Sequence, residues 1–437
     1  MKKVLIVSYY FPPLGGAGVQ RVLKFVKYLP QLGWEPVILT VKNVQYPAYD
    51  ASLLEEIPKE ATIYRSGSFD PLRVSYILKK LFGSGKNYSY RSVEKSNFIS
   101  KLSKFMFIPD NKNGWLFYAV MKGLKIAKKN KIDLIFSTSP PPTALLIGLF
   151  LKKFLKVPWV VDFRDSWETS LEEKTPSLLH RWLKRKIERK IFKNADSIIT
   201  VNEQLQNIFL NKYPKLKNIS VITNGYDEED FADVKEVRQD KFTIVYLGTF
   251  NRINDPLPFF EALSELSQEI TEFKNQVQFV HMGMALDFNL PELIQKLELQ
   301  KIVELKGYLT HRESLRQLTC ASILLLITTD SPGSEALSTG KIFEYFRTGK
   351  PILGILPPSG VAASLIKEIN AGVIVTPKNI LGIKQILKDY FRKWINCELK
   401  IELDQEKLKQ FERRYLTAKL AESSNRVIQA KWIEERN

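Results

Sequence analysis

The chain has 437 residues with 44% hydrophobic side chains, the share of an ordinary globular protein. Because one hydrophobic core stops growing near about 250–300 residues, this length predicts two domains. The two cysteines, Cys320 and Cys397, stand too far apart for a disulfide scaffold or a zinc site, which fits a reducing, cytoplasmic setting.

Apolar runs in the sequence are too short to span a membrane. The run at the N-terminus, residues 4–7, is too short for a signal peptide. The longest candidate, 144–151, ends at Lys152 and falls short of the about 20 residues that a bilayer requires. We therefore expect a cytoplasmic protein, either soluble or held at the inner face of the membrane as a peripheral protein.

The net charge of +18 comes largely from lysines and arginines in the first half of the chain. Nucleic acid, anionic lipid and phosphorylated substrates all suit a basic surface, and a solvated basic face is the simpler alternative. No nucleic-acid-binding motif accompanies the charge, so nucleic acid is not an expected partner. Basic amphipathic helices predicted at 69–82 and 92–107 would either contact an anionic membrane or pack on the sheet with their lysines reaching solvent.

The first half alternates short apolar runs with helical patterns, which is typical of a doubly wound parallel sheet. The runs that predict strands are residues 2–8, 35–41, 132–137, 157–162, 196–201 and 219–223. A glycine-rich loop, 9–18, follows the first strand, and its Gly15 and Gly16 either allow a phosphate or sugar to approach the backbone or simply form a turn. A dinucleotide fingerprint needs a third glycine where Arg21 stands, which argues against NAD.

Polar residues follow two of these strands. Ser139 lies in the proline-rich loop 137–142, and Arg164 and Asp165 follow the strand at 157–162. Because ligands bind at the carboxyl ends of strands in such sheets, these three residues are site candidates by position. An ion pair between Arg164 and Asp165 that fixes their loop is the alternative.

The second half repeats the alternation. Its predicted strands are 242–247, 277–282, 303–307, 322–327 and 372–375. Thr310 and Glu313 predict a capping box in which His311 begins a helix. We expect all three histidines of the chain to be structural, because no metal spacing or nucleophile accompanies them. The acidic run 227–230 is interpreted as a solvated linker.

The stretch 334–354 predicts a loop, a helix and a strand. Thr339, Gly340 and Lys341 fall in the first helical turn, where free backbone N–H groups, the helix dipole and a cation form an anion site. Glu344, one turn further on, is able to accept hydrogen bonds from a diol. A phosphate beside a diol describes a nucleotide. The alternative is an exposed ion pair between Lys341 and Glu344.

Taken in order, these motifs resemble those of the GT-B glycosyltransferases, and more narrowly of the retaining family 4 enzymes that build bacterial surface polysaccharides. The matching stretches cover nearly the whole chain and are YYFPPLGGAG at 9–18, PDNKNGW at 109–115, STSPPP at 137–142, PWVVDFRDSW at 158–167, ADSIITVNE at 195–203, TNGYD at 223–227 and TGKIFEYFRTGKPIL at 339–353. The resemblance implies an α/β fold of the GT-B type, with two Rossmann-like doubly wound domains facing across a cleft. They would be an acceptor-side domain at 1–224 and a nucleotide-sugar donor domain at 225–404, with helices at 405–437 crossing back toward the first.

The resemblance also implies roles for single residues. Those expected to bind the nucleotide-sugar donor are Gly15, Gly16, Arg252, Glu335, Thr339, Gly340, Lys341 and Glu344. Those expected on the acceptor side are Ser139 and Asp165, and those expected to take part in catalysis are Arg164, Asp165, Arg252 and Lys341. Glu344 would hold the ribose, while Lys341 and Arg252 would stabilise charge on the leaving nucleoside diphosphate. With these cations no metal is expected, no Asp-x-Asp motif is found, and the nucleotide-sugar is a substrate rather than a cofactor.

Two departures from the family pattern leave alternatives open. Ala336 stands where the family often has a second Glu, with Glu335 one place away, and Thr249 and Asn254 replace the usual Arg and Lys pair. The expected function is retaining, metal-independent transfer of a sugar to a lipid-linked or oligosaccharide acceptor in surface polysaccharide synthesis. The alternatives are a nucleotide-sugar epimerase and a catalytically silent GT-B binding or scaffold protein.

Overall fold

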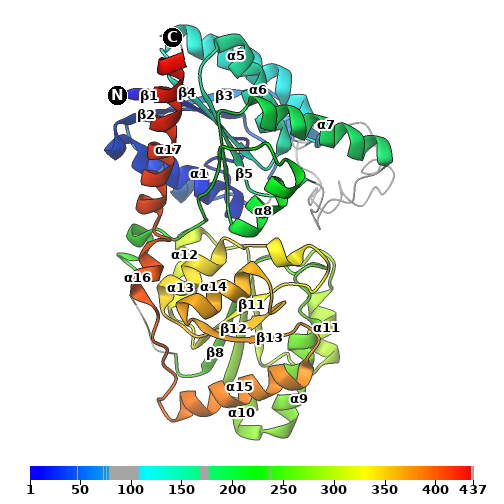
Figure 1. Ribbon diagram of the computed structural model, residues 1–437. Coiled ribbons are helices and arrows are strands. Elements are labelled where there is room, and N and C mark those ends of the chain that lie inside the picture. Colours follow the sequence, from blue (N-terminus) through cyan, green and yellow to red (C-terminus); the bar gives the residue numbers. More distant parts are fainter. Residues whose placement is uncertain are drawn as a thin grey trace. The chain divides into compact units, whose positions relative to one another are not determined.

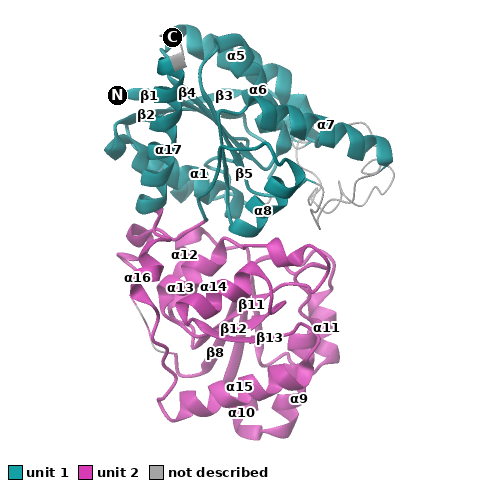
Figure 2. Ribbon diagram, in the orientation of Figure 1, with its two compact units in different colours: residues 1–223, 414–437 teal, residues 224–413 magenta. Residues whose placement is uncertain are grey.

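The computed structural model describes residues 1–434 apart from 47, 72, 75, 78–107, 168–176, 236 and 238 (Figure 1). The chain divides into two compact units (Figure 2). Unit 1 comprises residues 1–223 and 414–437, and unit 2 comprises residues 224–413. The chain therefore leaves unit 1 once, builds all of unit 2, and returns to unit 1.

Unit 1 is built on a parallel seven-stranded sheet. Its strands are β1 (Lys2–Val7), β2 (Trp34–Val41), β3 (Thr62–Ser66), β4 (Leu134–Ser139), β5 (Trp159–Phe163), β6 (Ser197–Thr200) and β7 (Ile219–Val221). They lie in the order β3-β2-β1-β4-β5-β6-β7, so the direction of winding reverses between β1 and β4. Ligands of doubly wound sheets bind outside the carboxyl ends of the strands at this reversal.

Each face of this sheet has its own core, because successive side chains of a strand point to opposite faces. Leu5 and Val7 of β1 belong to one core, and Val4 and Ile6 belong to the other. The first is covered by α5 (Leu116–Lys129), α6 (Pro142–Leu155), α7 (Leu178–Asn194) and α8 (Glu203–Lys212), and the second by α1 (Ala17–Tyr28) and the returning helix α17 (Arg413–Glu434). Short 3-10 helices of unit 1 are η1 (Leu29–Leu32), η2 (Ala51–Leu54) and η3 (Asn113–Trp115).

Unit 2 contains a parallel six-stranded sheet. Its strands are β8 (Phe242–Leu247), β9 (Val277–Met282), β10 (Val303–Gly307), β11 (Ile323–Ile327), β12 (Ile352–Ile355) and β13 (Gly372–Val375), in the order β10-β9-β8-β11-β12-β13. One face is covered by α9 (Leu257–Glu269), α10 (Thr271–Gln276), α11 (Leu290–Lys296) and α15 (Ile380–Ile395), and the other by α12 (His311–Thr319), α13 (Lys341–Thr348), α14 (Val361–Ile369) and α16 (Gln405–Lys409). The winding reverses between β8 and β11.

The predicted fold class is confirmed, since both sheets are parallel and carry helices on both faces. The strands predicted at 242–247, 277–282 and 303–307 have the observed bounds, and the capping box at the start of α12 is present. The strand β3 was not predicted, because its residues mix polar and apolar types without a clear alternation. The helix predicted at 92–107 lies outside the described residues, and the one at 69–82 is described only in part.

The acidic run 227–230 is not the solvated linker that the sequence suggested. It forms the 3-10 helix η4 (Glu228–Phe231), whose first turn is capped by the buried Asp227 side chain, an acceptor for the N–H of Glu229. Glu228 forms an ion pair with Arg347 of α13, in which Arg347 Nε donates over 2.6 Å. The prediction was wrong because the cation that pairs with this run lies far away in the sequence.

None of the helices in the described part of the chain combines the length and the hydropathy that crossing a bilayer requires.

Candidate functional site

Helix α13 is anchored at the reversal point of unit 2 by one tyrosine. The Tyr345 hydroxyl accepts a hydrogen bond from the N–H of Leu247, at the end of β8, over 3.0 Å. It donates to the carbonyl of Leu325 in β11 over 3.2 Å. The side chain therefore bridges the two strands between which the winding reverses, and the start of α13 is held beside their carboxyl ends. A ligand of a doubly wound sheet is expected at this place.

Lys341, the first residue of α13, directs its ammonium toward the end of β8. The Nζ atom lies 4.0 Å from the centroid of the Tyr246 ring. A Cβ atom on Gly248 would lie 2.9 Å from the same Nζ. Burial lowers the pKa of Lys341 to about 7. Among the described residues no carboxylate pairs with it, so a nearby anion would restore the charge that burial disfavours.

The backbone beneath this lysine is fixed by the neighbouring strand β9. His281 Nε2 lies 2.9 Å from the carbonyl oxygen of Gly248, and burial lowers the pKa of His281 to about 4, with repulsion from Lys341 adding to the effect. The imidazole is thus neutral and donates to that carbonyl. Gly283 has φ +142°, and a Cβ atom there would lie 2.1 Å from the same oxygen. Glycine is required at this position, and His281 has the structural role predicted for it.

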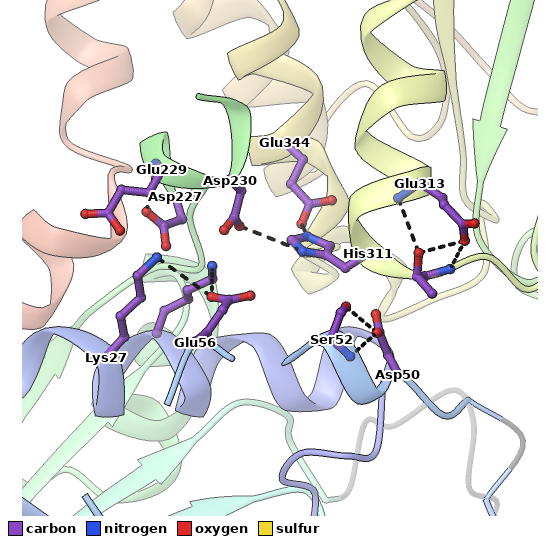
Figure 3. A network of polar contacts seen from close by, with 12 residues as sticks. Lys27, Asp50, Ser52, Glu56, Asp227, Glu229, Asp230, His311, Glu313 and Glu344 are labelled. Atoms are coloured by element: carbon purple, nitrogen blue, oxygen red, sulfur yellow. Dashed lines mark hydrogen bonds and ion pairs between the residues drawn. The ribbon is translucent and has the colours of Figure 1, made fainter. Parts of the chain in front are cut away.

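Glu344 is held by the histidine that begins α12. His311 Nε2 lies 3.0 Å from Glu344 Oε1, and His311 Nδ1 lies 3.8 Å from a carboxylate oxygen of Asp230 (Figure 3). In the described residues no ion pair joins Lys341 and Glu344, so the exposed pair that was the alternative interpretation is absent. The two side chains leave the same helix turn toward different neighbours. One carboxylate oxygen of Glu344 is engaged by His311, and the other, Oε2, has no hydrogen bond to a described residue.

The loop from β11 to α13 contains several buried hydroxyl groups without partners. Those with no hydrogen bond in the described part of the chain are the hydroxyls of Thr328, Ser334, Ser338 and Thr339. An unsatisfied buried polar group costs about 1–3 kcal/mol, so four in one loop indicate a place where a polar ligand or water would bind. No side chain caps the start of α13 at Gly340. The N–H of Ile342 donates to the carbonyl of Thr339 over 3.3 Å, and the N–H groups of Gly340 and Lys341 have no acceptor in the described residues.

Two further predicted donor residues lie near these loops. Glu335, in the 3-10 helix η5 (Ser334–Ala336), accepts a hydrogen bond from the N–H of Gly333 over 2.9 Å. Arg252 is exposed, and its guanidinium has no partner among the described residues. Asn254, which stands in place of a basic residue of the family, donates to the carbonyl of Thr249 over 3.2 Å and so stabilises the same loop.

In unit 1, predicted residues from three separate loops gather at the reversal between β1 and β4. Arg164 Nε donates to the carbonyl of Ser139 over 2.7 Å, and its Nη1 donates to the carbonyl of Gly18 over 3.3 Å. Gly15 and Gly16 precede α1, and Gly16 needs the flexibility of glycine because its φ is +84°. Burial lowers the pKa of Arg164. The guanidinium therefore ties the loop after β5 to the last residue of β4 and to the first turn of α1.

Asp165 is exposed and makes no ion pair with Arg164 in the described residues. The local pair that was the alternative for these two residues is therefore not formed. At the end of β5 desolvation by the surrounding protein raises the pKa of its carboxyl, while the nearby charge of Arg164 opposes that shift.

A buried ion pair beneath these loops was not predicted. Arg21 Nε and Nη2 donate to the two carboxylate oxygens of Asp162 over 3.0 and 2.9 Å, and neither side chain is exposed. Thr138 also donates to Asp162, and Arg21 donates to the carbonyl of Ile222. Arg21 stands where a dinucleotide-binding helix would have its third glycine. In this chain the residue at that position instead links α1 to Asp162 of β5 and to Ile222, which follows β7. The signal in the sequence was an arginine within an apolar helical stripe.

Comparison with known proteins agrees with the fold and the loops. The family model of Glycosyltransferase Family 4 matches residues 14–230. The chain is a family 4-like glycosyltransferase of the GT-B fold. No curated protein matches this glycosyltransferase significantly.

Solved structures resemble this glycosyltransferase over nearly their whole length at low identity. Sucrose-phosphate synthase from Thermosynechococcus elongatus is 14% identical with a TM-score of 0.65, covering 98% of this chain and 100% of that one. HepE from Anabaena, solved with UDP and glucose, is 18% identical with a TM-score of 0.64, covering 97% and 99%. WaaG, a glycosyltransferase involved in lipopolysaccharide biosynthesis, is 13% identical with a TM-score of 0.56, covering 98% and 95%.

The geometry of unit 2 gives this glycosyltransferase a polar site suited to an anion. Within the described residues its lysine has no carboxylate partner, its helix start has no side-chain cap and its loop hydroxyls are unpartnered, and such groups receive a phosphate in proteins. The chemistry that these groups support is stabilisation of negative charge rather than nucleophilic attack.

Proposed function

We propose that this glycosyltransferase is a retaining, metal-independent enzyme that transfers a sugar from a nucleotide-sugar to a lipid-linked or oligosaccharide acceptor. The observation that carries the proposal is Lys341, whose ammonium lies beside Tyr246 and Gly248 and pairs with no carboxylate of the described residues. Two similar structures add support, because HepE was solved with UDP and glucose and WaaG is involved in lipopolysaccharide biosynthesis.

In this proposal the donor diphosphate is bound by unit 2. The backbone N–H groups at Gly340 and Lys341 and the Lys341 ammonium hold the phosphates, with Arg252 reaching them from the loop after β8. Glu344 accepts hydrogen bonds from the ribose hydroxyls through Oε2, while His311 fixes Oε1. Glu335, in η5 of the loop between β11 and α13, also binds the donor.

The catalytic demand on these residues is electrostatic. During transfer the bond from the anomeric carbon to the phosphate oxygen breaks, and its electron pair stays on the nucleoside diphosphate. The acceptor oxygen forms the new bond on the same face of the sugar, as retention requires, and its proton passes to the phosphate oxygen that departs from that face. Lys341 and Arg252 stabilise the departing charge, which is the largest single contribution in comparable sites.

Unit 1 supplies the acceptor side in this proposal. Gly15 and Gly16 let the acceptor or the donor phosphate approach the start of α1. Arg164, which donates to the carbonyl of Ser139, fixes the backbone on the acceptor side, and Asp165 orients the acceptor hydroxyl. We place the reaction at the inner face of the membrane, where a lipid-linked acceptor of surface polysaccharide synthesis would be met.

The test begins with a screen of nucleotide-sugars by thermal shift, because a ligand at about 100 times its dissociation constant adds about 2.7 kcal/mol to stability. Transfer from the selected donor is then followed in the wild type and in Glu344→Ala. We expect the variant to unfold as the wild type does and to bind the donor at least about tenfold more weakly. Unchanged affinity would show that the donor site has been assigned to the wrong residues.

The same assay separates the other two functions. Ala336, together with Thr249 and Asn254, departs from the family pattern and favours a catalytically silent binding protein. That alternative predicts donor binding without hydrolysis or transfer. An epimerase would convert the donor in the absence of any acceptor, whereas the proposed transferase requires one.

A further inference from the structure

Helices α5 and α6 of unit 1 leave an apolar groove open between them. The two helices pack against each other and against the same face of the sheet (Figure 1). The groove has a volume of about 400 Å³ and is lined by Met121, Leu124, Lys125, Ala127, Lys128, Phe154 and Leu155. It lies outside the loops at which the proposed donor and acceptor residues gather, so glycosyl transfer does not account for it.

Large apolar side chains flank this groove and face solvent. Phe117 and Met121 lie one turn apart on α5, and Phe150 and Phe154 lie one turn apart on α6, so each pair shares one side of its helix. All four are exposed, Phe117 by 69% and Phe154 by 58%. Single exposed apolar residues are common, but a cluster on adjoining helices marks a surface that binds something.

The charge around the groove has one sign. Neither α5 nor α6 contains an acidic residue, whereas their exposed lysines include Lys125, Lys128 and Lys153. Within the described residues no carboxylate pairs with any of these three lysines. A second copy of the chain would bring the same positive charge to this surface and be repelled, so the groove favours an anionic occupant over self-association.

Another helix of unit 1 combines exposed apolar side chains with cations, at the end opposite to Asn194, which contacts Lys152 of α6. The first turns of α7, which packs beside α6, expose Leu178, Leu179 and Trp182. Lys186 places its ammonium 4.9 Å from the centroid of the Trp182 ring. Aromatic side chains with adjacent cations are characteristic of helices that lie at the boundary between headgroups and acyl chains.

We propose that the face formed by α5 and α6 binds the surface of an anionic membrane. Phe117, Met121 and Phe154 enter the boundary between headgroups and acyl chains, and the lysines contact lipid phosphates. This proposal rests on the proposed function and assigns its membrane contact to a defined surface of unit 1. Because vesicle binding needs neither donor nor turnover, its failure leaves the proposed glycosyl transfer intact.

The test is sedimentation of the full-length protein with vesicles of equal parts phosphatidylglycerol and phosphatidylcholine, compared with vesicles of phosphatidylcholine alone. We expect binding to the first, weakened by added salt, and little binding to the second. The double variant Phe117→Ser with Phe154→Ser should lower the partition coefficient by about tenfold for each substitution. The matched control is Leu381→Ser, which removes an exposed apolar side chain from α15 of unit 2.

Charge is tested separately. Lys125→Gln with Lys128→Gln should weaken binding to the anionic vesicles by about fivefold for each substitution. Lys241→Gln with Lys301→Gln removes the same net charge from exposed positions of unit 2 and should leave binding as it is. The four substituted residues, Phe117, Phe154, Lys125 and Lys128, are all exposed. Thermal unfolding and donor affinity of both double variants should therefore match those of the wild type.

Three results would overturn the proposal. The wild type does not bind anionic vesicles, or both double variants bind them as well as the controls do. The third is a wild-type dimer in solution that the phenylalanine substitutions dissociate without changing vesicle binding. That result would make the groove an interface between copies of the chain.

Discussion

Lys341→Met should stabilise the free protein and weaken its binding to a nucleotide-sugar. Burial beside Tyr246 and Gly248 lowers the pKa of Lys341 from its usual 10.5 to about 7. Each unit of pKa change corresponds to about 1.4 kcal/mol, and part of the side chain is still exposed to solvent, so we take about 2 kcal/mol as the cost of charging it. For a unit of this size, that is a rise in melting temperature of about 4–8 °C when the lysine is removed.

The dependence of this gain on pH has a definite sign. Because the folded pKa lies below the unfolded one, the folded state loses its proton first, and folding is penalised at every pH below the unfolded value. The penalty is largest below about pH 7 and disappears as the pH rises to about 10.5. The advantage of the variant over the wild type should therefore shrink between these limits. Thermal unfolding over this range measures it, with Lys378→Met, an exposed lysine of the same unit, as the control.

Ligand binding supplies an independent measure of the same lysine. If the donor diphosphate pairs with Lys341, it raises the pKa again, and the complex takes up about 0.5 proton near pH 7 and about 0.9 near pH 8. Calorimetry in buffers of different ionisation enthalpy counts these protons, and Lys341→Met should take up none. A nucleotide-sugar that binds tightly without proton uptake, or a variant less stable than the wild type, would refute the argument.

Four further results follow from the geometry. Glu344→Gln keeps a partner for His311 but loses the charge that binds the ribose, so donor affinity measured by calorimetry should fall by about tenfold with no change in melting temperature. Asp162→Asn leaves Arg21 buried without its carboxylate and should cost about 3–5 kcal/mol in urea unfolding, and a smaller loss would mean that water reaches the arginine. Gly283→Ala would bring a Cβ atom to 2.1 Å from Gly248 O, so we expect low yield or a melting temperature reduced by about 2–12 °C, the effect of about 1–3 kcal/mol of backbone strain. Transfer activity should persist after treatment with EDTA, and a loss restored by Mg²⁺ would contradict the proposed metal independence.

Local patterns in the sequence predicted the elements, and they also placed the candidate residues at strand ends. The glycine-rich loop before α1, the loop carrying Ser139 and the first turn of α13 are each specified by a few neighbouring residues. Such signals require no knowledge of the rest of the chain. The strand β3 was not predicted, because its residues are partly polar and the neighbouring sequence has no clear helical or strand period.

Local sequence patterns did not predict the contacts between residues that are distant in the sequence. His311 and Glu344 are separated by 33 positions, and Arg21 and Asp162 by 141. A capping box accounts for the place of His311 in its helix but says nothing of what its ring contacts. Likewise the sequence marks Lys341 as a cation at a helix start, whereas its lowered pKa depends on Tyr246, which reaches it only through the fold.

The return of α17 to unit 1 has a consequence for how the protein is made. Leu416 and Leu420 of this last helix complete the core that lies over Val4 and Ile6 of the first strand. Residues 414–434 are therefore synthesised after the whole of unit 2, so residues 1–223 gain this layer of their core only after unit 2 has been made. Attempts to express residues 1–223 alone should yield an aggregation-prone fragment, and joining the terminal helix to it by a short linker should rescue it.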